Sequence, residues 1–407
     1  MAKFKFLPPS ATPDSSVLLT SRGVRAFVDG LVSTALAIYL GLLGLSKFRI
    51  GVITTATLVG SGVVTIGVGL RAHAMNRQRL LQVVALVMIL TGVGFATLTN
   101  FWLLIAVAVL GTMNPSNGDV SVFLPTEQAL LPGTVSDKFR TALFGRYSLV
   151  AFVLGAFGAL AAGLPALSAK HHWLSPVTSY RLVFVVYTAA GVTVMMLYRQ
   201  LAYVPPPVSN SRAVGLGESR AIVIRMAALF SLDSLGGGFV VSTMMIVWLQ
   251  NRFALSAGAI SVIFFITSLL SGLSAMLAVR IARRIGLVRT MVFTHLPANG
   301  FLMLTPFMPN VSLAVTCLIC RSLLSQMDVP VRSSYVMAVV TPAERPAAAS
   351  ITNVPRSVAS ALPPVAAGWM LAHSKFGWPL LIGGGLKALY DVLLLVMFRH
   401  VKPPEER

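Results

Sequence analysis

The chain has 407 residues, of which 56% are hydrophobic and only 11% are charged. A soluble domain carries roughly 25% charged residues, so most of this chain does not face water. The formal net charge of +20 comes from basic residues that gather in alternate loops and form no single patch, which argues against nucleic-acid binding. The composition predicts an integral membrane protein.

Apolar segments of about 20 residues, long enough to cross a bilayer, recur along the sequence. They predict twelve transmembrane helices, centred near residues 34, 60, 89, 110, 153, 190, 238, 268, 299, 322, 361 and 389. Such runs are too long for barrel strands, and in lipid every backbone polar group must be bonded internally. The predicted fold class is therefore all-α integral membrane, with twelve transmembrane helices.

The pattern of basic residues predicts the topology. Residues 1–20 contain lysines but no short apolar core followed by a cleavage site, so we interpret them as a disordered lead. Lys and Arg concentrate there and in every second loop, which predicts that both termini are cytoplasmic, in a plasma or bacterial inner membrane. The Pro-, Ser- and Gly-rich stretch 201–224 predicts a linker between a six-helix half at 21–200 and another at 225–400, before a tail at 401–407.

The two halves repeat at an offset of about 205 residues. The matched pairs are Asp29 with Asp233 (204 apart), Asp119 with Asp328 (209 apart), Arg140 with Arg345 (205 apart) and Gly163 with Gly368 (205 apart). The repeat predicts two pseudo-symmetric six-helix halves, with a binding site near the bilayer midplane where they meet.

This arrangement resembles the major facilitator superfamily over residues 20–400. The family's Gly-x-x-x-Asp-Arg-x-Gly-Arg loop is degenerate here, with His73 at the acidic position and Asn76 at the second glycine. Arg140 and Arg345 match the family's Arg near the ends of helices 4 and 10. The Gly-Pro ending of helix 5 in proton antiporters is absent. The resemblance implies a transporter working by alternating access, with helices 1, 4, 7 and 10 lining the cavity.

Asp29 and Asp233 are the candidate proton-coupling residues. A carboxylate in hydrocarbon costs a few kcal/mol, so it is seldom kept there without a role. Such an acid can exchange protons near neutral pH, as a proton-coupled carrier needs. The alternative for Asp29 is a structural role, in which its carboxylate caps backbone groups or pairs with Arg22 or Arg25. Residues Gly236–Gly238, after Asp233, either permit close helix packing or let the helix unwind at a binding site.

A second group of charges predicts a cytoplasmic gate of ion pairs. Asp328 and Arg332 are four residues apart and share a helix face. Arg146 is a candidate partner for Asp119, and Glu127 is assigned to the same group. Breaking such pairs on one side and remaking them can make two rocking halves bistable.

Deeper polar residues are candidates for substrate binding or proton relay: Arg321, Arg356, Asn114, Asn117, Gln326 and Asn353. An Arg offers five donors that suit a carboxylate or phosphate, so an anion contact is one interpretation of Arg321 and Arg356. A structural pair with Asp328 or Asp233 is the other. Lys387 and Asp391 are four residues apart, and we expect them to neutralise each other.

Cys317 and Cys320 form at most part of a soft-metal site, because no third ligand stands at a reliable spacing. No cofactor is predicted. A nucleotide-binding loop and a nucleophile–base pair are both missing from the sequence, which argues against an ATP-driven pump and an enzyme.

The sequence therefore predicts a secondary active transporter of a small organic solute, coupled to protons, monomeric and in contact with lipid. The resemblance favours export. A transition-metal carrier, a facilitator without proton coupling and a non-transporting receptor remain the alternatives.

Overall fold

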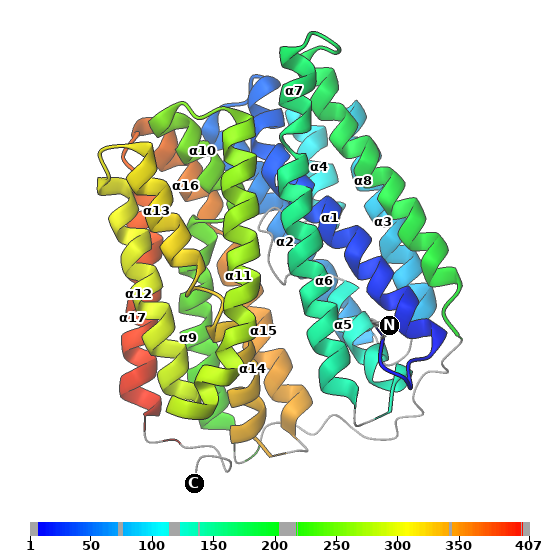
Figure 1. The fold of residues 1–407 in the computed structure, drawn as a ribbon, viewed down its shortest axis with the longest axis vertical. Helices are drawn as coiled ribbons and strands as arrows, with labels where there is room; N and C mark the ends of the chain where they lie inside the picture. The colour runs from blue at the N-terminus through cyan, green and yellow to red at the C-terminus, as the bar shows by residue number, and fades with distance from the viewer. Residues whose placement is uncertain are drawn as a thin grey trace, which may run out of the picture. The chain divides into compact units, whose positions relative to one another are not determined.

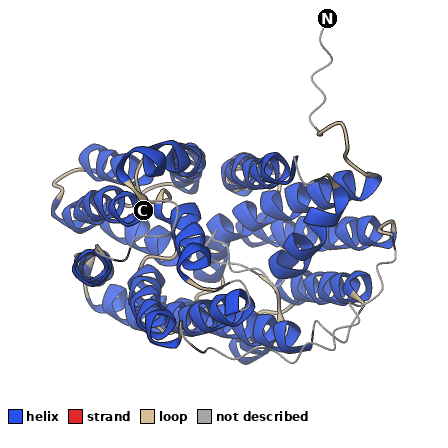
Figure 2. Cartoon of the chain, turned by 90° about the horizontal axis from the view of Figure 1, so that it is seen from below, coloured by secondary structure: helices blue, strands red, loops and turns tan. Residues whose placement is uncertain are grey.

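The computed structural model describes residues 7–71, 76–113, 123–136, 139–202, 217, 219–341, 344–399 and 401. Across these ranges all regular secondary structure is helical, as Figure 1 and Figure 2 show. The predicted all-α fold class is confirmed. Within the described ranges, eight stretches are long and apolar enough to cross a membrane by length and composition.

The helices follow the predicted segments in chain order. They are α1 (Pro13–Leu42), α2 (Lys47–Arg71), α3 (Arg77–Thr97), α4 (Phe101–Leu110), α5 (Phe123–Leu130), α6 (Arg140–Ala161), α7 (Leu164–Lys170), α8 (Pro176–Arg199), α9 (Arg220–Phe239), α10 (Ser242–Phe253), α11 (Ala257–Ile285), α12 (Leu287–Leu304), α13 (Val311–Ser322), α14 (Asp328–Val339), α15 (Arg345–Ala361), α16 (Pro363–His373) and α17 (Trp378–Phe398), with 3-10 turns η1 (Leu131–Thr134) and η3 (Thr305–Phe307). Several predicted spans are thus made of two shorter helices in line.

Side chains placed before α3, α8 and α13 accept hydrogen bonds from free N–H groups in the first turns of these helices. The Oδ1 of Asn76 accepts from the backbone N–H of Gln78 at 2.9 Å, and the Oδ1 of Asn310 accepts from that of Leu313 at 3.0 Å. Ser175 caps α8 in the same way. Such caps contribute about 1 kcal/mol each, and they fix where α3, α8 and α13 begin.

Proline and glycine divide the long spans. α15 ends at Ala361 and α16 begins at Pro363, because proline cannot continue the hydrogen-bond ladder of the helix before it. Residues 236–238 remain helical, and α9 ends one residue later. A Cβ on Gly236 would lie 2.7 Å from the carbonyl oxygen of Gly383, and one on Gly238 would lie 2.5 Å from that of Ser360. These contacts support the close-packing interpretation of Gly236–Gly238.

The chain divides into two compact units. The first comprises Met1–Leu45, Ala56–Val208 and Ala257–Phe265, and the second comprises Ser46–Thr55, Ser209–Ser256 and Ile266–Arg407. In the first unit α1 packs against α6 and α8, and α3 packs against α8. In the second unit α9 packs against α15 and α17, and α12 packs against α17, α14 and α13. The predicted domain boundaries at 21–200, 201–224 and 225–400 stay a prediction.

In the first unit glycine lets α1 and α6 approach closely. A Cβ on Gly158 would lie 1.8 Å from the carbonyl oxygen of Phe27, and one on Gly30 would lie 2.0 Å from that of Gly155. No side chain fits at either position without moving a backbone. Close contact of this kind is a main source of association between helices in lipid, where apolar burial contributes little.

We expect Gly158→Ala to lower the free energy of unfolding by about 1–3 kcal/mol, because the added methyl group pushes α1 and α6 apart. Gly145→Ala is the matched control on the same helix, since its Cβ would meet nothing within 4 Å. The control should be neutral or stabilising, because alanine favours helix over glycine by about 1 kcal/mol. Thermal denaturation of both variants in detergent measures the difference, and equal melting temperatures would contradict this packing.

Glu344 anchors the segment that leads into α9. Hydrogen bonds from Ser219 and from the backbone N–H of Gly217 lower the pKa of the Glu344 carboxyl. Thr341 donates to its Oε2 at 3.1 Å. Because these donors favour the ionised carboxylate, they stabilise the folded protein at pH values above the pKa of an unfolded Glu, about 4.3.

This stabilisation should disappear as pH falls through the lowered pKa of Glu344. At pH 7 we expect Glu344→Gln to melt below wild type, and well below pH 4 the two proteins should melt together. Thermal denaturation across this pH range measures the gap. A gap that persists unchanged in acid would show that the charge on Glu344 is not what holds the segment.

Candidate functional site

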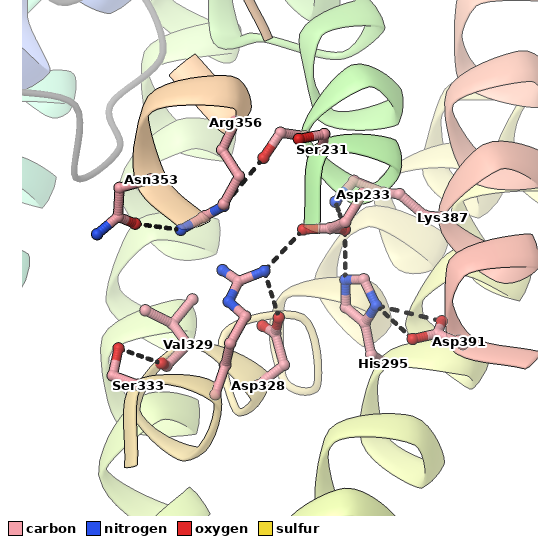
Figure 3. Close-up of polar contacts among 12 residues, drawn as sticks. Ser231, Asp233, His295, Asp328, Val329, Ser333, Asn353, Arg356, Lys387 and Asp391 are labelled. Carbon is pink, nitrogen blue, oxygen red and sulfur yellow. Dashed lines mark hydrogen bonds and ion pairs between the residues drawn. The ribbon is translucent and has the colours of Figure 1, made fainter. Parts of the chain in front are cut away.

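Asp233 lies at the centre of a buried charged group in the second unit. Its Oδ2 accepts from the Nη1 of Arg332 on α14 at 2.9 Å, and its Oδ1 accepts from the Nζ of Lys387 on α17 at 2.7 Å. The residue is only 5% exposed on α9. Figure 3 shows Asp233 facing the Lys387 and His295 side chains. Two cations from two other helices therefore balance one carboxylate in an apolar interior.

Arg332 bridges two acids. Its Nη1 also lies 3.4 Å from the Oδ2 of Asp328, one turn earlier on α14. Its guanidinium carbon lies 5.4 Å from the ring centroid of Phe230 on α9, in a cation–π contact. The expected shared face of Asp328 and Arg332 is confirmed by this distance. Arg332 also reaches a different helix, which the spacing alone did not predict.

His295 extends the group toward α17. Its Nδ1 lies 2.9 Å from the Oδ1 of Asp391, and its Nε2 lies 3.8 Å from the Oδ1 of Asp233. Asn299, one turn later on α12, donates to the Oδ2 of Asp391 at 2.8 Å. Our expectation that Lys387 and Asp391 neutralise each other was wrong. Lys387 pairs with Asp233, and Asp391 pairs with His295, because the two residues contact different neighbouring helices.

The two deep arginines sit beside this group. The Nε of Arg356 donates to the Oγ of Ser234 at 3.2 Å, and its Nη1 donates to the Oδ1 of Asn353 at 3.1 Å. The Nε of Arg321 is buried and has no hydrogen-bond partner among the residues that the structure describes. Gln326 lies half-buried between α13 and α14. Neither arginine forms an ion pair within the described part of the chain, so their anion-binding and relay roles stay predictions.

The first unit has its own buried charge, centred on Glu127 of α5. Arg25 of α1 forms an ion pair with it. Tyr147 of α6 donates to its Oε2, Tyr198 of α8 donates to its Oε1 at 2.6 Å, and Ser21 donates to Oε1 at 3.2 Å. Glu127 and Arg25 are essentially inaccessible to water. Our grouping of Glu127 with the gate residues is untested, but its partners tie four helices together.

The two units repeat this pairing with the charges exchanged. Glu127 and Arg332 are 205 residues apart, as are Arg25 and Phe230, so both pairs occupy equivalent places in the repeat. In the first unit the cation stands on α1 and stacks on Phe123 of α5 at 4.3 Å. In the second unit the cation stands on α14 and stacks on α9. Equivalent helices, α1 with α5 and α9 with α14, are thus joined by an ion pair in each unit, with the cation and the acid on exchanged helices.

Asp29 has a different environment from Asp233. It is half-buried on α1 and has no hydrogen bond or ion pair with the described residues. The charges of Arg25 and Arg22 act on it from its own helix, and Arg25 is already bound to Glu127. Asp29 is thus the less constrained of the two candidate coupling acids.

Three of the predicted site residues, Asn114, Asn117 and Asp119, lie outside the described residues. Arg146 lies half-buried on α6. The pairing of Asp119 with Arg146 therefore stays a prediction. Cys317 is buried and Cys320 is half-buried, and the described residues contain no group of three His, Cys, Asp or Glu that could hold a metal ion.

Sequence reasoning did not assign His295, Asn299, Tyr147 or Tyr198 to a site. The signal for His295 was available, because it is an ionisable residue within an apolar segment and Asn299 follows one turn later on the same face. The two tyrosines carried no such signal, because a tyrosine in a membrane helix is common and only its partner shows that its hydroxyl is used.

Comparisons with known proteins agree with the fold. Residues 226–407 match the family model of the Major Facilitator Superfamily. The chain is 25% identical to the uncharacterized membrane protein YJR124C of Saccharomyces cerevisiae, over 96% of this chain and 95% of that protein. It resembles the D-xylose-proton symporter with a TM-score of 0.74 and 13% identity, over 93% and 96% of the two chains. A bacterial homolog of the human lysosomal transporter Spinster gives a TM-score of 0.71 and 13% identity, over 96% of both.

These findings define an integral membrane protein with the transporter fold of two six-helix halves. Residues 226–407 match the model of the Major Facilitator Superfamily, and the whole chain shares its fold with solved transporters. No subfamily is identified.

The Arg25–Glu127 pair supplies a test of the energetics. We expect Arg25→Met to lower the free energy of unfolding by about 3–5 kcal/mol, because it leaves Glu127 buried without its cation. The double variant Arg25→Met/Glu127→Gln should lose much less, because the uncompensated charge is gone. Thermal denaturation of the purified proteins measures both. A double variant that is as unstable as the single one would contradict the assignment of the loss to buried charge.

Proposed function

We propose that this protein is a secondary active transporter that moves a small organic solute by alternating access and couples this movement to protons. The observation that supports the proposal is the bridging of Asp233, on α9, to Arg332 on α14 and Lys387 on α17 inside an apolar unit. A buried network of this kind is costly for stability and does not need to exist in a passive scaffold.

A proton that binds to this network can change how the helices are held together. If the negative charge at Asp233 is neutralised or taken by another cation, Arg332 and Lys387 lose a partner, and α14 and α17 lose their electrostatic attachment to α9. Two alternative sets of ion pairs on packed helices make a two-state element. A bound proton and a bound solute can then each favour one state.

Asp29 is the proposed coupling acid of the first unit. Because it has no fixed partner among the described residues, a change in its protonation does not have to break an existing ion pair. The D-xylose-proton symporter, with which this chain shares its fold, carries protons according to its name, which supports coupling in this architecture.

Arg321 and Arg356 are the proposed contacts for an acidic group of the solute. Both lie beside the Asp233 network, and the Nε of Arg321 lacks a hydrogen-bond partner in the described ranges. A buried donor without a partner costs about 1–3 kcal/mol, which a bound carboxylate or phosphate would recover. Export, a cytoplasmic location of both termini and residence in a plasma membrane remain part of this proposal.

The test is solute flux in proteoliposomes under an imposed pH gradient, with a panel of organic anions, organic cations, sugars, nucleosides and divalent metals. We expect one class to accumulate in the wild-type vesicles. Asp29→Asn and Asp233→Asn should each reduce gradient-driven accumulation at least tenfold, because neither amide can carry the charge change.

Asp14→Asn is the matched control. Asp14 lies in the first turn of α1, where it accepts from the backbone N–H of Ala202 at 3.3 Å, outside both charged groups. It should transport as wild type does. Flux that ignores the pH gradient would identify a facilitator, and full gradient-driven flux in both Asn variants would contradict the coupling assignment.

A further inference from the structure

His295 is a buried titratable residue to which the proposed function gives no role. It is 3% exposed on α12, and its ring lies between two carboxylates, Asp391 and Asp233 (Figure 3). We propose that His295 is the proton-binding residue of the second unit, and that its proton competes with Lys387 for one oxygen of Asp233. This inference rests on the proposed function and names the residue that holds the proton.

The partners of His295 define which nitrogen is free. Both oxygens of Asp391 lie near Nδ1, at 2.9 and 3.2 Å, and a carboxylate only accepts hydrogen bonds. We therefore assign the hydrogen of the neutral imidazole to Nδ1. The Nδ2 of Asn299 lies 3.1 Å from the same Nδ1, but it donates to the Oδ2 of Asp391 at the shorter distance of 2.8 Å and so fixes this acid. The lone pair is left on Nε2, which faces the Oδ1 of Asp233.

The position of Nε2 allows it to bind and release a proton. Its distance of 3.8 Å from the Oδ1 of Asp233 is too long for a hydrogen bond but within reach of an ion pair. A proton on Nε2 turns it into a charged donor aimed at this oxygen. The same oxygen already accepts from Lys387 at 2.7 Å. A charged imidazole and the ammonium group thus compete for one acceptor.

Four neighbouring helices bring charged groups to His295, and those groups that form ion pairs can balance one added proton. α17 contributes Lys387, Tyr390 and Asp391, α14 contributes Asp328 and Arg332, α9 contributes Asp233, and α13 contributes Arg321, which forms no ion pair within the described residues. The ion-paired set holds three carboxylates and two permanent cations. One proton on the imidazole therefore neutralises this set.

Lys387 packs against the glycines of α9. Its chain lies across the glycines of α9, since a Cβ on Gly236 would lie 2.9 Å from its Cγ, and one on Gly237 would lie 3.6 Å from its Cε and 3.7 Å from its Nζ. A larger residue at Gly236 would block the lysine. Protonation of His295 thus changes which residue holds α17 to α9: the ammonium of Lys387 leaves, and the imidazolium of α12 takes its place.

The first experiment needs no substrate. Nitrogen-15 NMR of the purified, histidine-labelled protein in detergent should show one signal that is absent from His295→Gln and that reports an Nδ1–H tautomer when neutral. This signal should shift as the pH is varied, because the imidazole changes charge when it binds or releases a proton. In Asp391→Asn the tautomer preference should be lost, and Asp391→Glu should restore it. A His295 signal that does not titrate would overturn the proposal.

The second experiment compares two modes of transport, with the solute that the proteoliposome panel identifies. His295→Gln should lose at least tenfold in accumulation driven by a pH gradient, but should keep exchange of labelled for unlabelled solute at equal pH within about twofold, because exchange moves no net proton. His171→Gln, at an exposed histidine, is the control and should keep both.

The outcomes separate this inference from the proposed function. Gradient-driven accumulation that survives in His295→Gln overturns the inference alone, and so does equal loss of accumulation and exchange in a folded variant, which would mark a structural role. If His295→Gln does not fold, Asp391→Asn replaces it with the same expected split. Wild-type flux that ignores the pH gradient overturns the proposed function, while the NMR titration still decides whether His295 binds a proton.

Discussion

Buried charges in this protein are paired between helices, and these pairs limit how the helices can pack. A carboxylate such as Asp233 cannot stay ionised in an apolar interior without cations in contact, because its desolvation costs several kcal/mol. Arg332 and Lys387 supply them from two other helices, α14 and α17. The helices of the second unit are therefore placed by electrostatics as well as by packing. A change in one charge must change how the helices hold each other.

The first unit meets the same constraint with the opposite polarity. There Arg25 is the cation on α1, and Glu127 on α5 is the acid, with two tyrosine hydroxyls completing its hydrogen bonds. The tyrosines supply neutral donors where the second unit has charged ones. The hydrogen bonds of Glu127 are therefore made without a histidine, whereas the network of the second unit contains His295. This asymmetry explains why we place proton binding within the second unit on His295, while Asp29 is the free acid of the first.

Glycine and the charged groups act together in the second unit. The glycines after Asp233 let α17 and α15 approach α9 closely. The Lys387 side chain packs against Gly236 and Gly237, where no side chain stands between it and the carboxylate of Asp233. The close approach of α17 to α9 brings Lys387 within ion-pair distance of Asp233. Because the glycines carry no side chains, none of them blocks the lysine from leaving this carboxylate. The interpretation of the glycines as packing residues and the interpretation of the region as functional are for this reason compatible.

The fold class could be predicted from the sequence, because apolar segments of membrane length and an internal repeat are visible in composition and periodicity. The sequence also identified Asp29, Asp233 and Arg332 as unusual, since an ionisable residue in an apolar run is visible without coordinates. Which charges form pairs became visible only in the packed helices. Lys387 and Asp391 share a face of one helix, yet each is bound to a different neighbour. Partners on separate helices follow from helix rotation and packing, which the order of residues along one helix does not contain.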